Sequence, residues 1–556
     1  MTDIEIATNA EKLPIRDIAA RLGVCEDLIE PYGRLKAKLP LSLIDEEKIR
    51  KAKLVLVTAI TPTPAGEGKT TVSIGLADGL SAIGKKCCAV LREPSLGPVF
   101  GIKGGAAGGG YSQVVPMEDI NLNFTGDFNA VEKAHNLLAA MIDNALHFGR
   151  RSLVDLDPRT VTWKRVMDMN DRSLRNIVVG LGGKAQGVPR ETGFDITAAS
   201  EIMAILCLSS DIKDLTERLG NIYVGRTFAG EPVRARDLKA EGAMAALLRD
   251  AMKPNLVQTL AHTPAIVHGG PFANIAQGTN TIVATKMGLS LADYVVTEAG
   301  FGSDLGGEKF LDIKCQAGGL RPSVIVIVAT ARALKMHGGV AKTDLGREDV
   351  AAVMNGMHNL ERHVKNMLGY GVRVVVAVNR FATDTDAELD AIRTACRALG
   401  VEAVVANVWA EGGNGAKNLA RQVVAEAESG KSDYKPLYKW SEPLEDKITR
   451  IAKDIYGADG VEFAPKALKD LEVAKEIGLD EAAVCIAKTQ YSFTDDPKQV
   501  GRVGHHTLHI RGVELAAGAG FIIPLAGEMM RMPGLPLHPA AENMTVDAEG
   551  KISGLS

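Results

Sequence analysis

Residues 53–84 constrain the fold most, because they place a strand, a glycine-bearing turn and a helix in immediate succession. An apolar, β-branched run at 54–60 is followed by a turn with Gly66 and Gly68, and then by apolar residues at helical spacing after Lys69. Backbone N–H groups of such a turn, together with the positive N-terminal end of a helix, can surround a phosphate group. The stretch therefore predicts a phosphate-binding loop.

The loop predicts a nucleoside triphosphate site with bound Mg²⁺. In such a site Lys69 reaches the β- and γ-phosphates, and the Thr70 hydroxyl ligates Mg²⁺. The usual motif begins with glycine, whereas this chain has Thr63 between two prolines, so the start of the loop must differ. Spacing alone leaves a plain glycine turn as the alternative; the strand and the helix argue against it. The residues expected to bind the nucleotide are Thr63, Pro64, Ala65, Gly66, Glu67, Gly68, Lys69 and Thr70.

Bulk composition limits the class of protein. A chain of 556 residues allows about three or four domains, and 46% hydrophobic with 24% charged residues is typical of a soluble globular enzyme. The net charge of −4, with scattered Lys and Arg, argues against nucleic acid or a membrane as a partner. The seven cysteines form no C-x-x-C pair, and the N-terminus lacks a signal or transit composition, so we expect free thiols and a cytoplasmic protein.

Strand-like and helix-like runs alternate through the middle of the chain. After the first strand we expect strands at 86–92, 176–181, 293–297, 323–330, 373–379 and 402–409, and helices at 129–148, 349–368, 386–399 and 415–427. This alternation predicts an α/β fold that contains a P-loop, with a mostly parallel sheet flanked by helices and additional smaller α/β domains.

We expect three domains with approximate edges. Residues 1–360 would hold the nucleotide domain and N-terminal helices, largely within 1–52, where Leu28, Ile29, Tyr32 and Leu35 would share one helical face. Residues 361–445 would form an α/β domain, and residues 446–556 a C-terminal α/β domain.

Ligand groups collect at the carboxyl ends of parallel strands. Arg92 and Glu93 follow the second strand and so stand where a substrate would bind, with an ordinary surface ion pair as the alternative. The next stretch, 101–111, is too dense in glycine for a stable helix or strand. A flexible linker is one reading, but apolar flanks favour close approach to a ligand or tight packing of loops.

Two long stretches, GIKGGAAGGGY at 101–111 and VATARALKMHGG at 328–339, resemble the formate–tetrahydrofolate ligase family, also called formyltetrahydrofolate synthetase. Supporting stretches lie at 63–71, 91–98, 194–201, 268–280, 297–310 and 379–381. The resemblance covers essentially the full chain, and the length fits the single-function form. It implies an ATP-dependent ligation of formate to tetrahydrofolate through formyl phosphate, giving 10-formyltetrahydrofolate, ADP and phosphate. It also implies Mg²⁺ with ATP, a monovalent cation (K⁺ or NH₄⁺) and a homotetramer.

The resemblance further implies roles for single residues. Lys69 and Arg92 would be catalytic and hold the phosphoryl group of formyl phosphate, and Glu93 would belong with the monovalent cation. Phe381 and Trp409 would line the pterin or the adenine site, so that the domain at 361–445 would contribute to the folate site; a core role is the alternative for each residue. The formyl-phosphate loop would contain Gly101, Lys103, Gly104, Gly105 and Tyr111, and Asp127 is a further candidate for orienting a substrate.

Some residues and activities stay open at the level of sequence. The group His505, His506 and His509 suggests a metal site, although a structural or surface role is preferred; Lys335 and His337 could bind phosphate or shape a loop. The alternative activities are a nucleotide-switch NTPase and another ATP-dependent enzyme that activates a different carboxylate.

Overall fold

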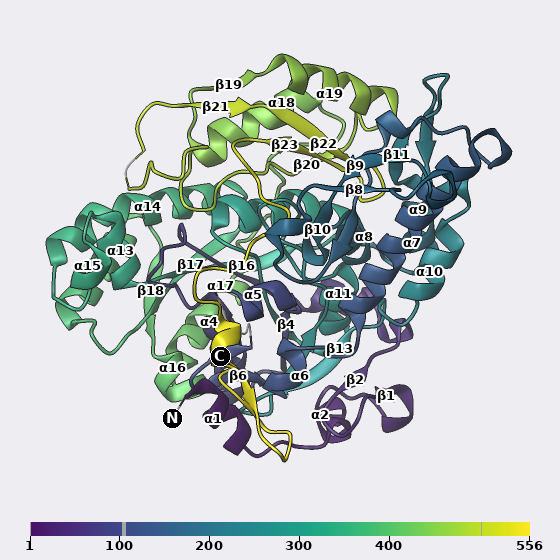
Figure 1. Ribbon diagram of the computed structural model, residues 1–556. Helices are drawn as coiled ribbons and strands as arrows, with labels where there is room; N and C mark the ends of the chain where they lie inside the picture. Colours follow the sequence, from purple (N-terminus) through teal and green to yellow (C-terminus); the bar gives the residue numbers. More distant parts are fainter. Residues whose placement is uncertain (1, 103–106, 502, 556) are drawn as a thin grey trace.

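The computed structural model describes residues 2–102, 107–501 and 503–555 (Figure 1). Within these residues the centre is a twelve-stranded sheet whose middle strands run parallel. In spatial order the parallel strands are β14 (Pro264–Val267), β4 (Cys87–Leu91), β15 (Tyr294–Glu298), β3 (Lys53–Ala59), β16 (Pro322–Ala329), β17 (Arg373–Asn379) and β18 (Glu402–Ala406). The prediction of an α/β fold with a mostly parallel sheet is confirmed.

One edge of this sheet is antiparallel. There β13 (Asn255–Thr259) pairs with β14, with β2 (Ala37–Lys38) and with β6 (Ser112–Val115). Two further short strands, β1 (Glu30–Pro31) and β5 (Gly108–Gly109), extend β2 and β6 as hairpins.

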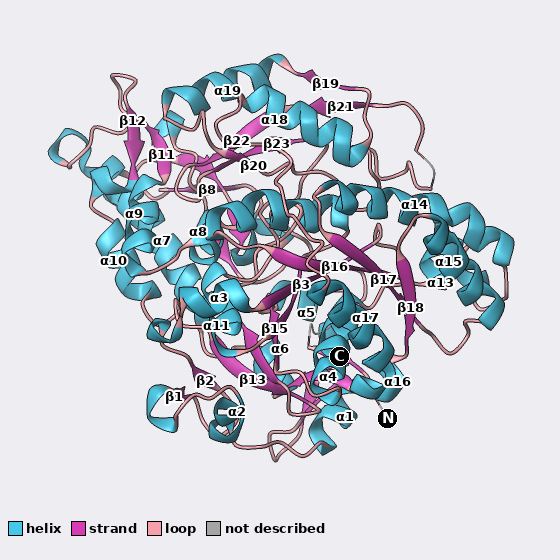
Figure 2. Ribbon diagram, turned by 180° about the vertical axis from the view of Figure 1, so that it is seen from behind, coloured by secondary structure: helices cyan, strands magenta, loops and turns pink. Residues whose placement is uncertain are grey.

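Helices lie on both faces of the sheet (Figures 1 and 2). The helices of the described residues, including those that pack elsewhere in the molecule, are α1 (Asp3–Asn9), α2 (Ile15–Arg21), α3 (Glu46–Lys51), α4 (Lys69–Ala82), α5 (Leu96–Phe100), α6 (Met117–Asn121), α7 (Asp127–Phe148), α8 (Glu201–Leu208), α9 (Ile212–Asn221), α10 (Glu241–Leu248), α11 (Ile282–Leu291), α12 (Gln316–Gly318), α13 (Ala331–His337), α14 (Val350–Gly369), α15 (Asp386–Ala398), α16 (Val408–Glu411), α17 (Lys417–Glu428), α18 (Leu444–Arg450) and α19 (Pro465–Glu476). Among the described residues, none of these helices has the length and apolar character needed to cross a membrane.

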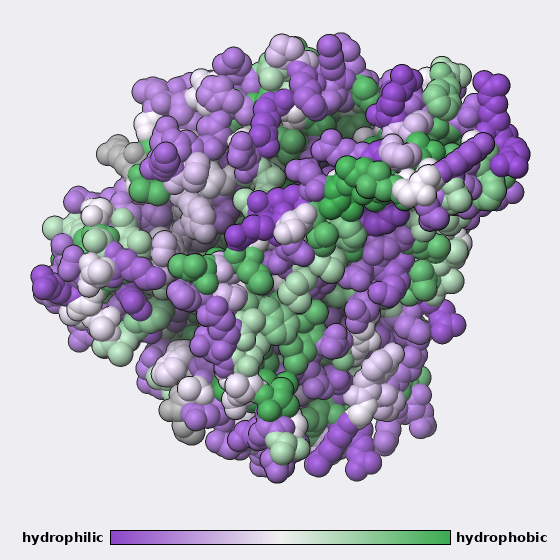
Figure 3. Space-filling model, viewed as in Figure 1, coloured by the Kyte–Doolittle hydropathy of each residue, from purple (hydrophilic) through white to green (hydrophobic). Residues whose placement is uncertain are grey.

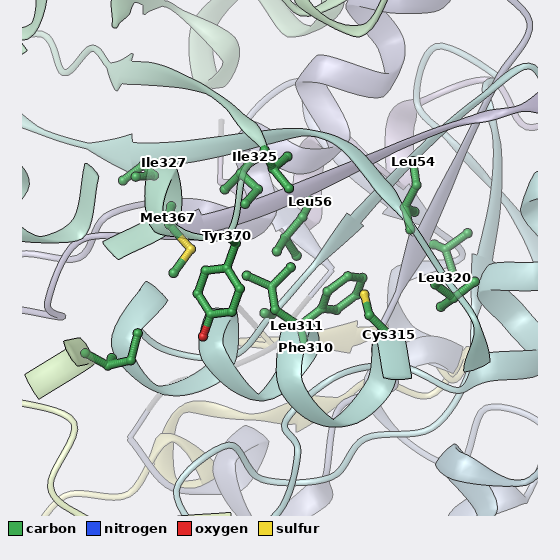
Figure 4. Packing of buried hydrophobic residues seen from close by; sticks show 14 of the residues in the cluster. Leu54, Leu56, Phe310, Leu311, Cys315, Leu320, Ile325, Ile327, Met367 and Tyr370 are labelled. Atoms are coloured by element: carbon green, nitrogen blue, oxygen red, sulfur yellow. The ribbon is translucent and has the colours of Figure 1, made fainter. Parts of the chain in front are cut away.

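The β3 strand shows how the sheet separates two cores. Leu54 and Leu56 belong to one buried cluster, and Val55 and Val57 belong to another, because successive side chains of a strand point to opposite faces. In Figure 4 Leu56 lies beside Leu311, and Leu54 lies near Leu320, on the first face. A strand buried on both faces needs a continuous apolar run, which explains why β3 could be predicted from sequence.

Smaller sheets surround the central one. They are β7 (Arg165–Met167) with β10 (Phe194–Ile196); β8 (Ile177–Val179) with β9 (Arg190–Thr192); β11 (Tyr223–Arg226) with β12 (Pro232–Arg234); β19 (Gly460–Phe463) with β21 (Thr507–Ile510); β20 (Ala483–Val484), β23 (Phe521–Leu525) and β22 (Gly512–Ala516); and β24 (Thr545–Val546) with β25 (Ile552–Ser553). Figure 2 shows α18, α19 and strands β19 to β23 gathered at one end of the molecule. This arrangement agrees with the expected additional α/β regions.

Two local predictions were wrong. The expected helical run through residues 28–35 is instead a β1–β2 hairpin, since Pro31 lacks an N–H donor and Gly33 adopts φ +76°. The strand expected at 402–409 ends at Ala406, and Trp409 lies on α16. The three-domain division stays a prediction; β17 and β18, from the proposed middle domain, belong to the central sheet.

Candidate active site at the ends of the parallel strands

The loop between β3 and α4 turns on two glycines. Gly66 and Gly68 have φ values of +76° and +70°, in the left-handed region that favours glycine. A Cβ atom on Gly68 would lie 2.3 Å from Nδ2 of Asn379, whereas one on Gly66 would meet no atom within 4 Å. The Asn379 amide in turn donates to the Glu67 carbonyl at 3.1 Å. The end of β17 therefore fixes the last turn of this loop before α4.

Thr63 and Glu67 explain the unusual start of the loop. Oε1 of Glu67 accepts hydrogen bonds from the Thr63 backbone N–H at 2.7 Å and from its hydroxyl at 3.0 Å. The Thr63 carbonyl accepts from the N–H of Gly66 at 3.1 Å. Burial raises the pKa of Glu67 to about 6. A threonine thus closes the turn through side-chain hydrogen bonds at the position where the usual motif has glycine.

Buried polar groups hold Thr61, just before the loop. Its carbonyl accepts from Nε2 of His337 at 3.0 Å, and its hydroxyl contacts the Asn359 amide at 2.9 Å and Nε2 of His363 at 3.0 Å. Burial lowers the pKa of His337 and of His363 to about 4, so both rings are neutral at pH 7. Of the two roles left open for His337, these contacts favour shaping the loop.

Lys335 is fully buried and already has its partners. Its Nζ lies 2.8 Å from Oε1 of Glu388 and donates to the carbonyls of Leu345 and Arg347 at 2.7 and 2.9 Å. These contacts join α13, the loop that follows it and α15, which favours a structural role over phosphate binding.

Lys69, Thr70 and Arg92 converge on the end of β15 and the loop that follows it. The Lys69 ammonium donates to the Phe301 carbonyl at 3.1 Å, and the Thr70 hydroxyl donates to Oε2 of Glu298 at 2.9 Å. The other Glu298 oxygen lies 3.8 Å from Nε of Arg92. This convergence arises because β15 lies between β3 and β4 in the sheet, so Glu298 stands between the residues that follow those strands.

Sequence reasoning did not single out Glu298 or Phe301. Glu298 is 3% exposed and joins the phosphate loop to the end of β4. Phe301 is one of few non-glycine residues with positive φ, at +58°, a conformation that presents its carbonyl to Lys69. The one available signal was the polar and glycine-rich stretch that follows the strand at 293–297.

Glu93 lies in a buried acidic pocket. Burial and the nearby Asp127 carboxylate raise the pKa of Glu93 well above its usual range, and its Oε2 has no hydrogen-bond partner among the described residues. Asp127 is itself engaged, since Oδ1 lies 2.8 Å from Nζ of Lys38 and Oδ2 accepts from the Asn255 amide at 2.7 Å. A substrate-orienting role for Asp127 stays a prediction; its observed contacts place it in a buried ion pair.

The glycine run lies partly outside the described residues, namely at Lys103, Gly104 and Gly105. Gly101 ends α5, and its carbonyl accepts from the Ala540 N–H at 2.7 Å, where the C-terminal tail crosses this region (Figure 1). At Gly110, φ is +56° and a Cβ atom would lie 2.1 Å from the Trp409 carbonyl oxygen. The described glycines thus allow tight packing of loops against α16.

The two predicted stacking residues follow neighbouring strands, β17 and β18. Trp409 is 51% exposed, and its carbonyl accepts from the Tyr111 N–H at 2.9 Å. Phe381 is partly buried, with the Arg332 guanidinium 5.0 Å from the centre of its ring. Both residues therefore follow strands of the central parallel sheet, at the same edge where the phosphate loop follows β3.

The histidine group near the C-terminus forms separate surface contacts. His505 lies 3.1 Å from Asp459, and His509 lies 2.9 Å from Asp495. Among the described residues, no cluster of three or more His, Cys, Asp or Glu side chains could hold a metal ion. These contacts fit the surface role that we prefer for the group.

Comparison with known proteins identifies the family of the chain. Residues 1–556 match the model of the formate–tetrahydrofolate ligase family. The formate–tetrahydrofolate ligase of Paracoccus denitrificans (strain Pd 1222) is 58% identical over 555 residues, which cover 100% of both chains.

Proposed function

Since this chain belongs to the formate–tetrahydrofolate ligase family, whose members join formate to tetrahydrofolate with ATP, we propose that it does so through formyl phosphate. In the first step a formate oxygen attacks the γ-phosphorus, and the bond to ADP breaks. In the second step the secondary amine of tetrahydrofolate attacks the formyl carbon and loses its proton. Phosphate leaves with the electron pair of the broken C–O bond, which gives 10-formyltetrahydrofolate, ADP and phosphate.

The convergence of Lys69 and Arg92 near Glu298 carries the proposal. Formate and the γ-phosphate are both anions, so their approach requires positive groups that offset the repulsion and hold them in line. Lys69 comes from the first turn of α4 and Arg92 from the end of β4, and both lie beside the residues that follow β15. We assign both side chains to the transferred phosphoryl group.

Thr70 and Glu298 fit the Mg²⁺ that accompanies ATP. Their side-chain oxygens lie 2.9 Å apart at the start of α4, and Mg²⁺ prefers hydroxyl, carboxylate and phosphate oxygens. When bound there, Mg²⁺ would neutralise charge on the β- and γ-phosphate oxygens. The remaining ATP contacts are assigned to residues 63–69.

The Glu93 pocket fits a monovalent cation, K⁺ or NH₄⁺. Its buried Oε2 atom lacks a hydrogen-bond partner among the described residues, and the neighbouring Asp127 is already paired with Lys38. A cation beside Glu93 would favour its ionised form, which burial otherwise opposes.

The flat substrates are assigned to the two aromatic residues. Trp409 and Phe381 offer ring faces for the pterin and the adenine, and stacking of this kind contributes about 0.5–1.5 kcal/mol beyond burial. The glycine run would let main chain approach formyl phosphate and exclude water, which would otherwise hydrolyse it.

We also propose a homotetramer in the cytoplasm. Figure 3 shows a hydrophobic patch over the β8–β9 hairpin, where Val178 and Leu181 are 57% and 66% exposed. An exposed apolar patch of this kind suits a subunit contact.

The direct test supplies ATP, Mg²⁺, formate and tetrahydrofolate, and then acidifies the mixture to convert the product into its methenyl derivative. We expect ADP and the methenyl absorbance to form together, and only when all four components are present. Acetate and bicarbonate replace formate as controls. ADP release without the folate product, or equal turnover with acetate, would contradict the proposal.

A further inference from the structure

A cavity separate from the candidate active site lies between the α7–α8 region and the sheet formed by β20, β23 and β22. It has a volume of about 480 Å³, within the range of small-molecule sites. Its walls come from His135, Trp163 and Lys164, from Asp195 to Glu201, and from β22, β23 and α19. None of the residues assigned above to ATP, formate or folate lines it.

The cavity accounts for a sequence signature that the reaction does not use. Of the stretch 194–201, Asp195, Ser200 and Glu201 line the cavity. The Arg531 guanidinium reaches the same wall from the C-terminal tail, where it contacts Asp195 at 3.4 Å and also pairs with Glu514. Segments distant in sequence thus build one polar wall.

This wall presents hydrogen-bond acceptors that have no donor. Nε2 of His135 lies 3.1 Å from the Lys164 carbonyl and must donate to it, because a carbonyl oxygen only accepts. In the neutral ring Nδ1 is then an acceptor, and it is buried without a partner among the described residues. Oδ1 of Asp195 is also buried without a hydrogen bond; its nearest cation is the partly exposed Lys164 ammonium at 3.5 Å.

Glu201 adds a third acceptor. Its Oε1 accepts from the backbone N–H groups of Gly518 and Ala519 at 2.7 and 3.3 Å. Oε2 takes no part in these two hydrogen bonds. Burial raises the pKa of Glu201 to about 7, so in the empty cavity the carboxyl group is only partly ionised near neutral pH.

When Glu201 is ionised, the cavity wall carries one more acidic than basic side chain. The acidic side chains are Asp195, Glu201, Asp470 and Glu514, and the basic ones are Lys164, Lys466 and Arg531, while burial lowers the pKa of His135 to about 4 and keeps it neutral. Lys466 is already paired with Asp470 at 2.6 Å. The Trp163 ring, stacked on His135 at 4.1 Å between centroids, supplies a flat apolar surface beside the acceptors.

We propose that this cavity binds a small, flat organic cation of the amidinium or guanidinium class. Several N–H donors on one positive group would satisfy the buried acceptors, which otherwise cost free energy as unpaired polar groups. Its positive charge would offset the negative charge of the acidic side chains in the wall. Its apolar body would lie against Trp163, because cations are favoured near aromatic rings.

Titration calorimetry with benzamidinium chloride tests the site in the full-length protein. We expect saturable binding of benzamidinium and none of benzoate or benzyl alcohol, which have the same ring without the cationic donors. Between pH 6 and pH 8 affinity should rise by up to about tenfold, as Glu201 ionises. Lack of saturable benzamidinium binding, or equal binding of benzoate, would overturn the proposal.

A pair of isosteric variants locates the binding. Glu201→Gln keeps an oxygen that can accept from Gly518 and Ala519 but removes the charge, and should weaken benzamidinium roughly 10- to 100-fold. Glu472→Gln makes the same change on the exposed surface of α19 and should leave affinity unchanged. Equal affinity of the two variants would contradict the assignment, as would a crystal structure with benzamidinium bound elsewhere only.

Discussion

Two glycines in one loop offer a matched test of the architecture around the phosphate site. Gly66 and Gly68 both have φ near +70°, yet only at Gly68 would a Cβ atom meet the Asn379 amide, at 2.3 Å. Gly66→Ala should lower the free energy of unfolding by roughly 1–2 kcal/mol, because alanine must adopt a left-handed backbone conformation. Gly68→Ala should lower it by roughly 1.5–3.5 kcal/mol, because its methyl group also displaces Asn379 and breaks the hydrogen bond from Asn379 to Glu67.

A double-mutant cycle isolates the contact. In Gly68→Ala/Asn379→Ala the new methyl group no longer meets the amide, so the double variant should be more stable than the sum of the single effects predicts, by about 0.5–1.5 kcal/mol. Gly66→Ala combined with Asn379→Ala should be additive within about 0.5 kcal/mol. Urea unfolding of the ligand-free protein, followed by circular dichroism, gives these values. Equal costs at both glycines, with both cycles additive, would refute the argument that β17 fixes the loop.

Three further predictions concern charge, pH and stacking. Lys69→Ala and Arg92→Ala should each lower kcat about 10²–10³-fold with unchanged far-UV circular dichroism, and turnover near that of the unmodified protein would exclude the side chain from catalysis. Burial raises the pKa of Asp78 from 3.8 to about 7, so the folded state binds its proton more tightly than the unfolded state and the Asp78 contribution to stability falls as pH rises from 3.8 to 7. Between pH 5 and pH 8 the free energy of unfolding, measured by urea titration, should therefore decrease by about 2–3 kcal/mol less in Asp78→Asn than in the unmodified protein. Identical pH profiles of the two proteins would contradict this prediction. Trp409→Ala should raise KM for tetrahydrofolate or for ATP roughly 2- to 10-fold, and Phe381→Ala in the same assay shows which ring each aromatic stacks on; two unchanged KM values would contradict both assignments.

The parallel core could be predicted because burial on both faces leaves a clear pattern. The strands β3, β16 and β17 are continuous apolar, β-branched runs, and each was expected within a residue or two of its observed bounds. Residues 28–35 misled the prediction because their apolar spacing fits one face of a helix as well as a hairpin. There Pro31 and Gly33 determined the outcome.

Residues of the candidate site could be chosen from sequence where a local motif marks them, and not where their position depends on strand order. Lys69 and Thr70 belong to a motif, and Arg92 directly follows a strand. Glu298 and Asn379 are polar residues at the ends of strands, like several others in this chain. Their contacts with the loop exist because β15 lies beside β3 and because the end of β17 reaches the loop, relations that local patterns do not encode.

The fate of the formate oxygens tests the proposed reaction most directly. If formate attacks the γ-phosphorus, one formate oxygen bridges carbon and phosphorus and leaves with phosphate when the amine attacks. With [¹⁸O₂]formate, ATP and tetrahydrofolate, the account predicts one ¹⁸O atom in each product phosphate and one in the formyl group, measured by ³¹P NMR and mass spectrometry. Product phosphate without ¹⁸O, formed together with 10-formyltetrahydrofolate, would contradict a formyl phosphate intermediate.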